Sequence, residues 1–112
     1  MNPESVVQRQ LDAYNDRDLD SFMACYSDEV QLFRPPQPQP LMQGQAAMAA
    51  HYATKRFNLP GLHAQLVQRM VVGNKVVDHE RISGVRDEPY EAAVVFELSA
   101  GLITKVWFFD AD

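Results

Sequence analysis

The sequence predicts a single α+β domain covering residues 1–112. Helical hydrophobic spacing is confined to the first half of the chain, and long segments rich in β-branched residues fill the second half. The turns between those segments are too short for crossover connections, so neighbouring strands should run antiparallel. Helices followed by a meander of strands indicate a curved sheet with the helices packed on one side.

Three helices are expected before residue 57. The first begins at Asn2, a capping residue followed by a proline, and should end near Asp16. The second begins at Asp18, whose carboxylate can cap it, and should present Tyr26 on its apolar face before ending at 28–29. The third covers 45–56, an alanine-rich segment that follows Gly44.

The strands and loops follow from the turn residues. A short strand is expected at 30–33, and long strands are expected at 62–72, 75–85, 90–99 and 102–109. The four prolines within 34–40 remove amide donors and favour extended geometry. This segment is therefore predicted to be a stiff loop of the kind that can cover a cavity.

Composition argues against several classes of function. The net charge is −5 and the ten basic residues are scattered, so nucleic acid is not expected as a partner. No apolar run approaches the roughly 20 residues that span a membrane, and residues 1–5 lack the pattern of a secretion signal. A single cysteine, Cys25, fits a reducing compartment, so a cytoplasmic location is expected. Neither a metal nor a cofactor is predicted, because the histidines lack metal-ligand spacing and no Gly-rich phosphate loop is present.

The segment 75–85 is unusual for a core strand because both of its faces mix charged and aliphatic residues. Side chains alternate along a strand, so the two faces are Val76, Asp78, Glu80 and Ile82 on one side and Val77, His79, Arg81 and Ser83 on the other. An unpaired buried charge costs several kcal/mol or more. One face should therefore line a pocket or a subunit contact.

Several short motifs cover nearly the whole chain. They lie at 6–9, 13–20, 26–30, 44–48 with Tyr52, 80–81 and 101–109. In this order they resemble the nuclear transport factor 2-like superfamily, in particular its SnoaL-like and ketosteroid-isomerase-like branch. The resemblance implies a cone-shaped, curved antiparallel sheet with three N-terminal helices on its concave face, enclosing a largely apolar pocket. It also implies a homodimer formed through the outer sheet face, but says little about the reaction, because one fold hosts many chemistries.

The catalytic residues of ketosteroid isomerases are not matched in this sequence. The tyrosine on their first helix, their aspartate base and their protonated aspartate correspond to Gln10, Arg34 and Val94. Isomerisation by that route is not expected.

Limonene-epoxide-hydrolase-like members use an aspartate–arginine–aspartate relay, of which one residue is matched. The arginine corresponds to Arg81, whereas the aspartate positions hold Ser83 and Trp107. A lone arginine cannot activate water because it does not deprotonate in proteins. Epoxide hydrolysis by that route is therefore not expected either.

If the family register holds, the face with His79 and Arg81 points inward, together with Val94, Phe96 and Trp107. His79 is then the candidate general base or acid, since its ordinary pKa lies near neutrality. Arg81 is the candidate group for binding a carboxylate, enolate or carbonyl oxygen. These two residues are the predicted catalytic pair.

The alternative for Arg81 is structural, namely an ion pair with Glu29 or Asp12 that braces the cone. Ser83, Val94, Phe96 and Trp107 are predicted to contact a ligand. The opposite set is predicted to face a partner subunit, with an exposed surface as the alternative: Asp78, Glu80, Glu91, Val95, Glu97, Val106 and Phe108.

Three further ligand contacts are predicted outside the strands. Tyr14 lies on a helix face that should meet the sheet, although such a tyrosine can equally be a core residue. His51 can reach the pocket or stay half exposed, and Arg34 can stand at the pocket mouth or in solvent.

We therefore expect a pocket that binds a small, partly apolar organic ligand, with a carbonyl or carboxylate as its polar group. An isomerase, cyclase or hydratase activity is compatible with His79 and Arg81. The alternative is a non-catalytic ligand-binding or dimerisation module that lacks the catalytic residues of its relatives.

Overall fold

The computed structural model of the chain describes residues 2–110 and places six strands in one sheet, in the order β2-β1-β6-β5-β4-β3. The helices are α1 (Pro3–Asp16), α2 (Leu19–Met23) and α3 (Gln45–Lys55). The strands are β1 (Tyr26–Phe33), β2 (Met42–Gln43), β3 (His63–Val72), β4 (Lys75–Ser83), β5 (Tyr90–Ser99) and β6 (Leu102–Asp110). The predicted α+β class, with helices on one face of a curved sheet, is confirmed.

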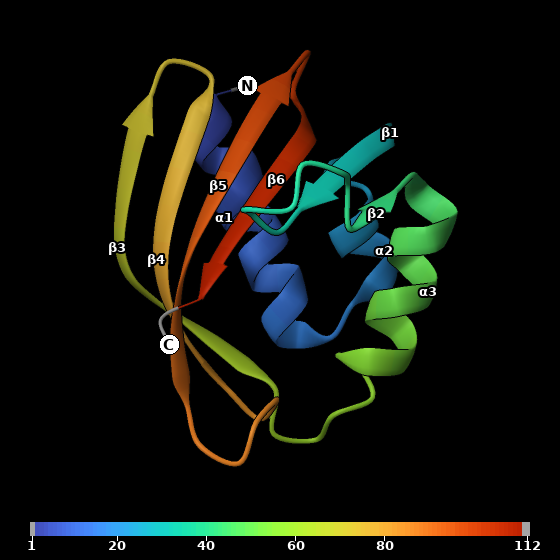
Figure 1. Cartoon of the computed structure of the whole chain (residues 1–112), viewed down its shortest axis with the longest axis vertical. Helices are drawn as coiled ribbons and strands as arrows, with labels where there is room; N and C mark the ends of the chain where they lie inside the picture. The colour runs from blue at the N-terminus through green and yellow to red at the C-terminus, as the bar shows by residue number, and fades with distance from the viewer. Residues whose placement is uncertain (1, 111–112) are drawn as a thin grey trace.

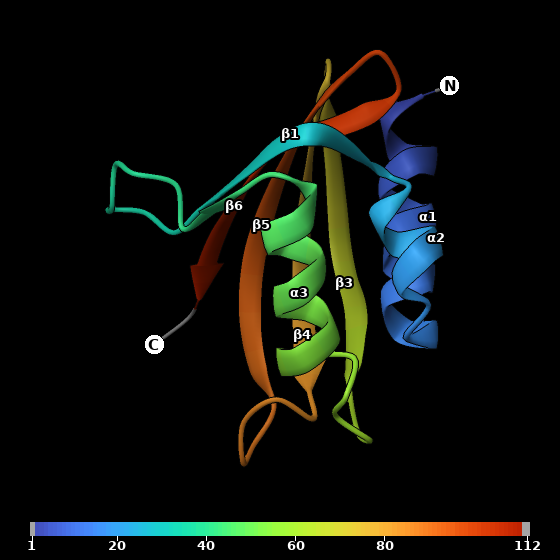
Figure 2. The same ribbon diagram turned by 90° about the vertical axis from the view of Figure 1, so that its right-hand side faces the viewer.

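The sheet curves around a central space. Figure 1 shows β3 to β6 forming one wall, α3 on the opposite side and α1 behind. In Figure 2 the loop after β1 projects to the side away from α1 and α2. None of the helices that the structure describes is both long and apolar enough to span a membrane.

Helix α1 begins where the sequence predicts. The Oδ1 atom of Asn2 accepts a hydrogen bond from the Ser5 amide at 2.8 Å, and Pro3 occupies the first turn. The helix ends at Asp16 and is followed by the capping residue Arg17, which adopts the left-handed conformation with φ 54°. Its buried side faces the sheet and includes the polar residue Gln10.

Helix α2 is shorter than predicted, and Tyr26 belongs to β1 instead. The Ile103 amide donates a hydrogen bond to the Cys25 carbonyl oxygen at 2.9 Å, which brings the chain into the sheet immediately after the helix. β1 then pairs with β6 in the parallel direction, so the sheet is not wholly antiparallel. This contact between segments far apart in sequence has no local signal.

Two side-chain contacts attach the helices to the sheet. The amide of Asn15, at the end of α1, donates to the Ala64 carbonyl oxygen at 2.9 Å and accepts from the Ala64 amide at 2.8 Å. Gln45, at the start of α3, donates to the Tyr26 carbonyl oxygen at 2.8 Å. Both helices are therefore fixed to strand backbone, which fixes the walls of the central space.

Candidate functional site

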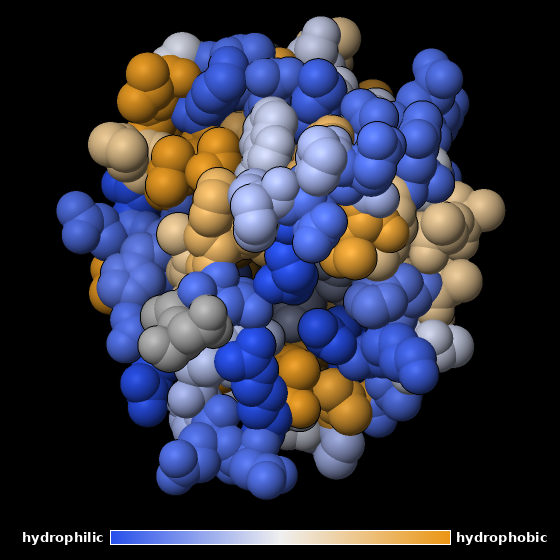
Figure 3. Space-filling view, in the orientation of Figure 1, coloured by the Kyte–Doolittle hydropathy of each residue, from blue (hydrophilic) through white to orange (hydrophobic). Residues whose placement is uncertain are grey.

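A cavity of about 90 Å³ lies between the sheet, α1 and α3. Most of its wall is apolar and includes the rings of Tyr14, Phe22 and Phe96. Its mouth lies at the loop after β1 and the end of β6, where Arg34 and Asp110 contribute to the lining. The space-filling view shows a hollow near the middle of this face, bordered mostly by hydrophilic residues (Figure 3).

Strand β4 presents to the cavity the face opposite to the one predicted. Asp78 and Glu80 are buried, whereas His79 and Arg81 are exposed. The register explains this, because Asp78 lies opposite Val94 of β5, and directly opposed residues share a face of the sheet. The prediction that His79 and Arg81 point into the pocket is therefore wrong.

His79 and Arg81 lie on the outer face of the sheet instead. His79 Nε2 lies within ion-pair distance of the Glu91 carboxylate on the outside of the sheet. Arg81 forms no ion pair with any residue in the described part of the chain, so the bracing pair with Glu29 or Asp12 is also not observed. The Ser83 hydroxyl donates to the His63 carbonyl oxygen at 3.4 Å, between β4 and β3.

Strand β6 also presents to the cavity the face opposite to the one predicted. Trp107 lies on the outer face, where it stacks on Phe33 with ring centroids 5.6 Å apart. Val106 and Phe108, predicted to face a partner, line the cavity. The same register explains both strands. Phe108 pairs directly with Val94, which faces inward, so Phe108 faces inward and its neighbour Trp107 faces outward.

The other predicted ligand-binding residues do lie at the cavity. They are Tyr14, Arg34, His51, Val94 and Phe96. The helix and loop positions among them were predicted from their own segments, and Val94 and Phe96 were predicted from the family register. Contact between these side chains and a ligand stays a prediction.

Asp78 is a fully buried carboxylate that has its own counter-ion. The Arg69 guanidinium, on β3, donates to both of its oxygens, with Nε to Oδ1 at 2.7 Å and Nη2 to Oδ2 at 2.9 Å. Arg69 also donates to Gln8 Oε1 of α1 at 2.8 Å. This bidentate, charge-assisted pair meets the requirement that a buried charge be neutralised and hydrogen-bonded.

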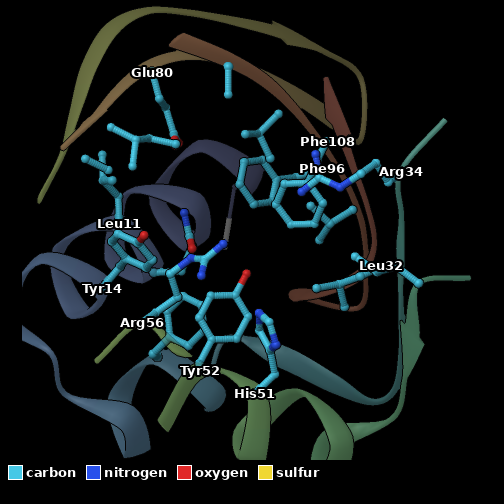
Figure 4. A pocket seen from close by; sticks show the side chains of 18 of the residues that line it. Leu11, Tyr14, Leu32, Arg34, His51, Tyr52, Arg56, Glu80, Phe96 and Phe108 are labelled. Atoms are coloured by element: carbon cyan, nitrogen blue, oxygen red, sulfur yellow. The ribbon is translucent and has the colours of Figure 1, made fainter. Parts of the chain in front are cut away.

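Glu80 lies two residues further along the same face and has no such partner. Its side chain is 6% exposed, lines the cavity and forms no hydrogen bond or ion pair with another described residue. Burial, followed by the negative charge of Asp78, raises the pKa of the Glu80 carboxyl to about 8. At neutral pH this carboxyl is therefore mostly protonated and can donate a hydrogen bond into the cavity. Figure 4 shows it entering from the sheet side.

Several uncharged polar groups share the cavity with Glu80. The hydroxyl groups of Tyr14 and Tyr52 form no hydrogen bond with the described residues. Burial raises the pKa of the Tyr52 hydroxyl to about 12 and raises that of Tyr14 as well, so both remain protonated donors. Gln10 accepts a hydrogen bond from the Tyr26 hydroxyl at 2.9 Å through Oε1, which leaves its amide nitrogen free to donate.

His51, on α3, lies on the side of the cavity opposite the sheet (Figure 4). Partial burial, followed by the positive charges of Arg56 and Lys55, lowers its pKa below the ordinary value of 6.5. The imidazole is therefore mostly neutral at pH 7 and has one ring nitrogen able to accept a proton. The cavity thus contains a protonated acid and an unprotonated base at neutral pH.

Residues 7–106 match the sequence profile of the SnoaL-like domain, which is most of the chain. The chain belongs to the SnoaL-like domain family. No curated protein matches the sequence.

Solved structures with the same fold share little sequence with this SnoaL-like domain. A proposed ketosteroid isomerase from Kribbella flavida has a TM-score of 0.84 and 18% identity, over 98% of this chain and 78% of that one. A proposed polyketide cyclase from Sinorhizobium meliloti has a TM-score of 0.80 and 17% identity, over 93% of each chain. A SnoaL-like protein of unknown function from Burkholderia thailandensis has a TM-score of 0.75 and 19% identity, over 98% of this chain and 94% of that one. Likeness at these identities establishes the fold alone.

Two ionisable residues of the SnoaL-like cavity, Glu80 and Arg56, were missed by sequence reasoning. Glu80 was assigned to the outer face because the family register points Arg81 inward, and its raised pKa is not visible in sequence. Arg56 was given no role at a site, although it lines the cavity. A signal for Glu80 existed: pairing β4 with the apolar alternation of β5 places Glu80 opposite Ala92, on the inner face.

Proposed function

We propose that this SnoaL-like domain binds a small, partly apolar organic ligand in the cavity and transfers a proton to or from it. The observation that supports this most directly is the buried carboxyl group of Glu80, which faces the cavity and has no hydrogen-bond or ion-pair partner within residues 2–110. A buried carboxyl group without a hydrogen-bond partner lowers the stability of the fold, and ionisable groups with strongly shifted pKa values cluster at functional sites.

In the proposed chemistry, His51 acts as the base and Glu80 as the acid. His51 removes a proton from a carbon next to a carbonyl, and Glu80 donates a proton elsewhere on the ligand. The Tyr14 and Tyr52 hydroxyls would hydrogen-bond to the carbonyl oxygen as negative charge develops on it. Isomerisation, cyclisation and hydration–dehydration of carbonyl compounds all include such a step, so the proposal covers these three reaction classes. It replaces His79 and Arg81 as the candidate catalytic pair.

The test is exchange of carbon-bound hydrogen in D₂O. Cyclohexanone, phenylacetone and levulinate would be incubated with the protein, and deuterium incorporation next to the carbonyl followed by ¹H NMR. The proposal predicts incorporation above the buffer rate for at least one probe, with a large loss in Glu80→Gln and His51→Asn. Glu91→Gln, an exposed glutamate on the outer sheet face, is the matched control.

The competing result would be binding without exchange. If a probe perturbs cavity resonances in the protein spectrum but no deuterium enters it, the domain is a ligand-binding module rather than an enzyme. Exchange that persists at the wild-type rate in Glu80→Gln would remove the carboxyl from the mechanism.

We also propose that a second copy of the chain covers the outer sheet face. Five directly paired residues cross the strands there as one apolar row: Phe33, Trp107, Val95, Val77 and Met70. Ion pairs border this row, with Lys75 Nζ 3.3 Å from a Glu97 carboxylate oxygen on one side and the His79–Glu91 pair on the other. An apolar centre with a charged rim is typical of subunit interfaces. A cytoplasmic location remains part of the proposal, on the basis of the single cysteine.

A further inference from the structure

The mouth of the cavity contains a shared ion pair. Arg34 Nη1 and Arg86 Nη2 contact the same oxygen of Asp110, at 2.8 and 2.9 Å. The three residues come from the loop after β1, the β4–β5 loop and the end of β6. One carboxylate therefore neutralises only one of two guanidinium groups, and both arginine side chains are about half exposed, at 42% and 50%.

A further guanidinium lies inside the cavity. Arg56 follows α3 and lines the cavity, and Figure 4 shows its guanidinium group reaching between the rings of Tyr14 and Tyr52. Within residues 2–110 it has no carboxylate partner, and its side chain donates only to the Lys55 carbonyl oxygen at 2.9 Å. Burial raises the pKa of Tyr14 and Tyr52, and the positive charge of Arg56 opposes that rise; burial and then the same charge lower the pKa of His51.

The local charge is opposite to that of the chain as a whole. The net charge of the protein is −5, yet the residues of the cavity lining that are charged at neutral pH are Arg34, Arg56 and Asp110. Glu80 is mostly protonated and His51 mostly neutral, and Arg86 is attached from outside. Because a guanidinium stays charged at every relevant pH, the cavity and its mouth have an excess of positive charge.

We propose that the ligand is an organic carboxylate, with its acid group held by Arg56 and Arg34 and its apolar part inside the cavity. This inference rests on the proposed function and specifies the class of substrate. Guanidinium groups bind carboxylates in a bidentate manner, and a protonated Glu80 adds no like charge that would repel the anion.

The size of the cavity agrees with a ligand that extends into the mouth. Its volume of about 90 Å³ is smaller than the roughly 150 Å³ of an apolar cavity that takes up benzene. The enclosed space therefore accepts a short chain or part of a ring, and the remainder of the molecule must lie at the mouth beside Arg34.

The test compares phenylacetate with phenylacetamide, a neutral molecule of nearly the same shape, by isothermal titration calorimetry of the full chain. Phenylacetate should bind about tenfold more tightly or better, because a charge-assisted hydrogen bond contributes about 1.5–3 kcal/mol. Arg56→Gln should remove that preference, and Arg56→Lys should retain part of it. Arg81→Gln, which alters an exposed arginine on the other side of the sheet, should leave both affinities unchanged.

Thermal unfolding of each variant separates lost binding from lost folding. Equal binding of the two probes, or tighter binding of tetramethylammonium than of phenylacetate, would overturn the inference. So would a preference for phenylacetate that survives in folded Arg56→Gln. Failure of the inference is distinguishable from failure of the proposed function, because deuterium exchange into the neutral ketones requires Glu80 and His51 but no bound carboxylate.

Discussion

Asp78 and Glu80 lie two residues apart on the same inward face of β4, and in the part of the chain that the structure describes only Asp78 has a partner that neutralises it. Arg69 neutralises the charge of Asp78. The Glu80 side chain instead faces the cavity, and its pKa is raised to about 8. Asp78 is therefore a structural carboxylate, whereas the carboxyl group of Glu80 is free to act on a ligand.

The Asp78–Arg69 pair should contribute strongly to stability. Arg69→Met leaves a buried carboxylate without its counter-ion and should lower the free energy of unfolding by about 3–5 kcal/mol. Asp78→Asn removes the charge while keeping the shape, so the double variant Arg69→Met with Asp78→Asn should recover part of the loss. Urea denaturation of the four proteins gives the coupling energy, and independent effects of the two substitutions would contradict the structural role.

Glu80 should make the fold less stable as the pH rises. Between about pH 4.5, the ordinary value, and about pH 8, the folded chain retains a proton that the unfolded chain releases. The free energy of unfolding should therefore fall across this window, by a few kcal/mol at about 1.4 kcal/mol per pKa unit. In Glu80→Gln this decline should be absent, whereas Glu91→Gln should retain it. Denaturant titrations at a series of pH values would measure the difference.

The rate of proton transfer should have a bell-shaped pH dependence. It should rise as His51 loses its proton below pH 6.5, since its pKa is lowered, and fall above about pH 8 as Glu80 ionises. The measurement is the deuterium exchange rate against pH. Loss of the alkaline limb in Glu80→Gln would support the assignment, and an unchanged alkaline limb would argue against it.

The outer face should determine the oligomeric state. Val95→Glu places a charge in the middle of the apolar row and should convert the proposed dimer to a monomer. Val67→Glu, at the exposed bulge of β3 outside that row, is the matched control and should leave the dimer intact. Sedimentation velocity distinguishes the cases, and a monomeric wild type would contradict the proposal.

Gly84 should tolerate no side chain. It has φ +85°, and a Cβ atom there would overlap the backbone of Gly61 and Leu62. Gly84→Ala should therefore disrupt the packing of the β4–β5 loop against the segment before β3. At Gly73, with φ +60° and open space around it, alanine should cost only about 1 kcal/mol, from the strained conformation. Similar losses at the two positions in thermal unfolding would contradict this contrast.

The sequence predicted the fold well because its signals are local. The Asn2 cap, the proline loop and the short turns each depend on neighbouring residues, and the structure has a helix, a loop and hairpins at these places. The end of α2 was wrong because the pairing of β1 with β6 joins residues about 75 positions apart, as in Tyr26 with Ile103.

The cavity was only partly predictable for a physical reason. In β4 both faces hold charged and aliphatic residues, so alternation alone cannot select the inner face. The family resemblance, which matched Arg81 to a pocket arginine, selected the wrong face. The Arg69 counter-ion of Asp78 and the raised pKa of Glu80, which allow the other face to be buried, are properties of the folded chain. Tyr14 and His51, which lie on helices with one apolar side, reach the cavity as expected.

The protonation state of Glu80 can be measured directly by a ¹³C NMR titration of the glutamate side-chain carboxyl carbons, with Glu80→Gln used for assignment. One resonance, absent from the variant, should titrate with a midpoint near pH 8, well above the ordinary value of 4.5. A Glu80 resonance that titrates near pH 4.5 would show an ionised carboxylate at neutral pH, and would contradict its role as the protonated acid of the cavity.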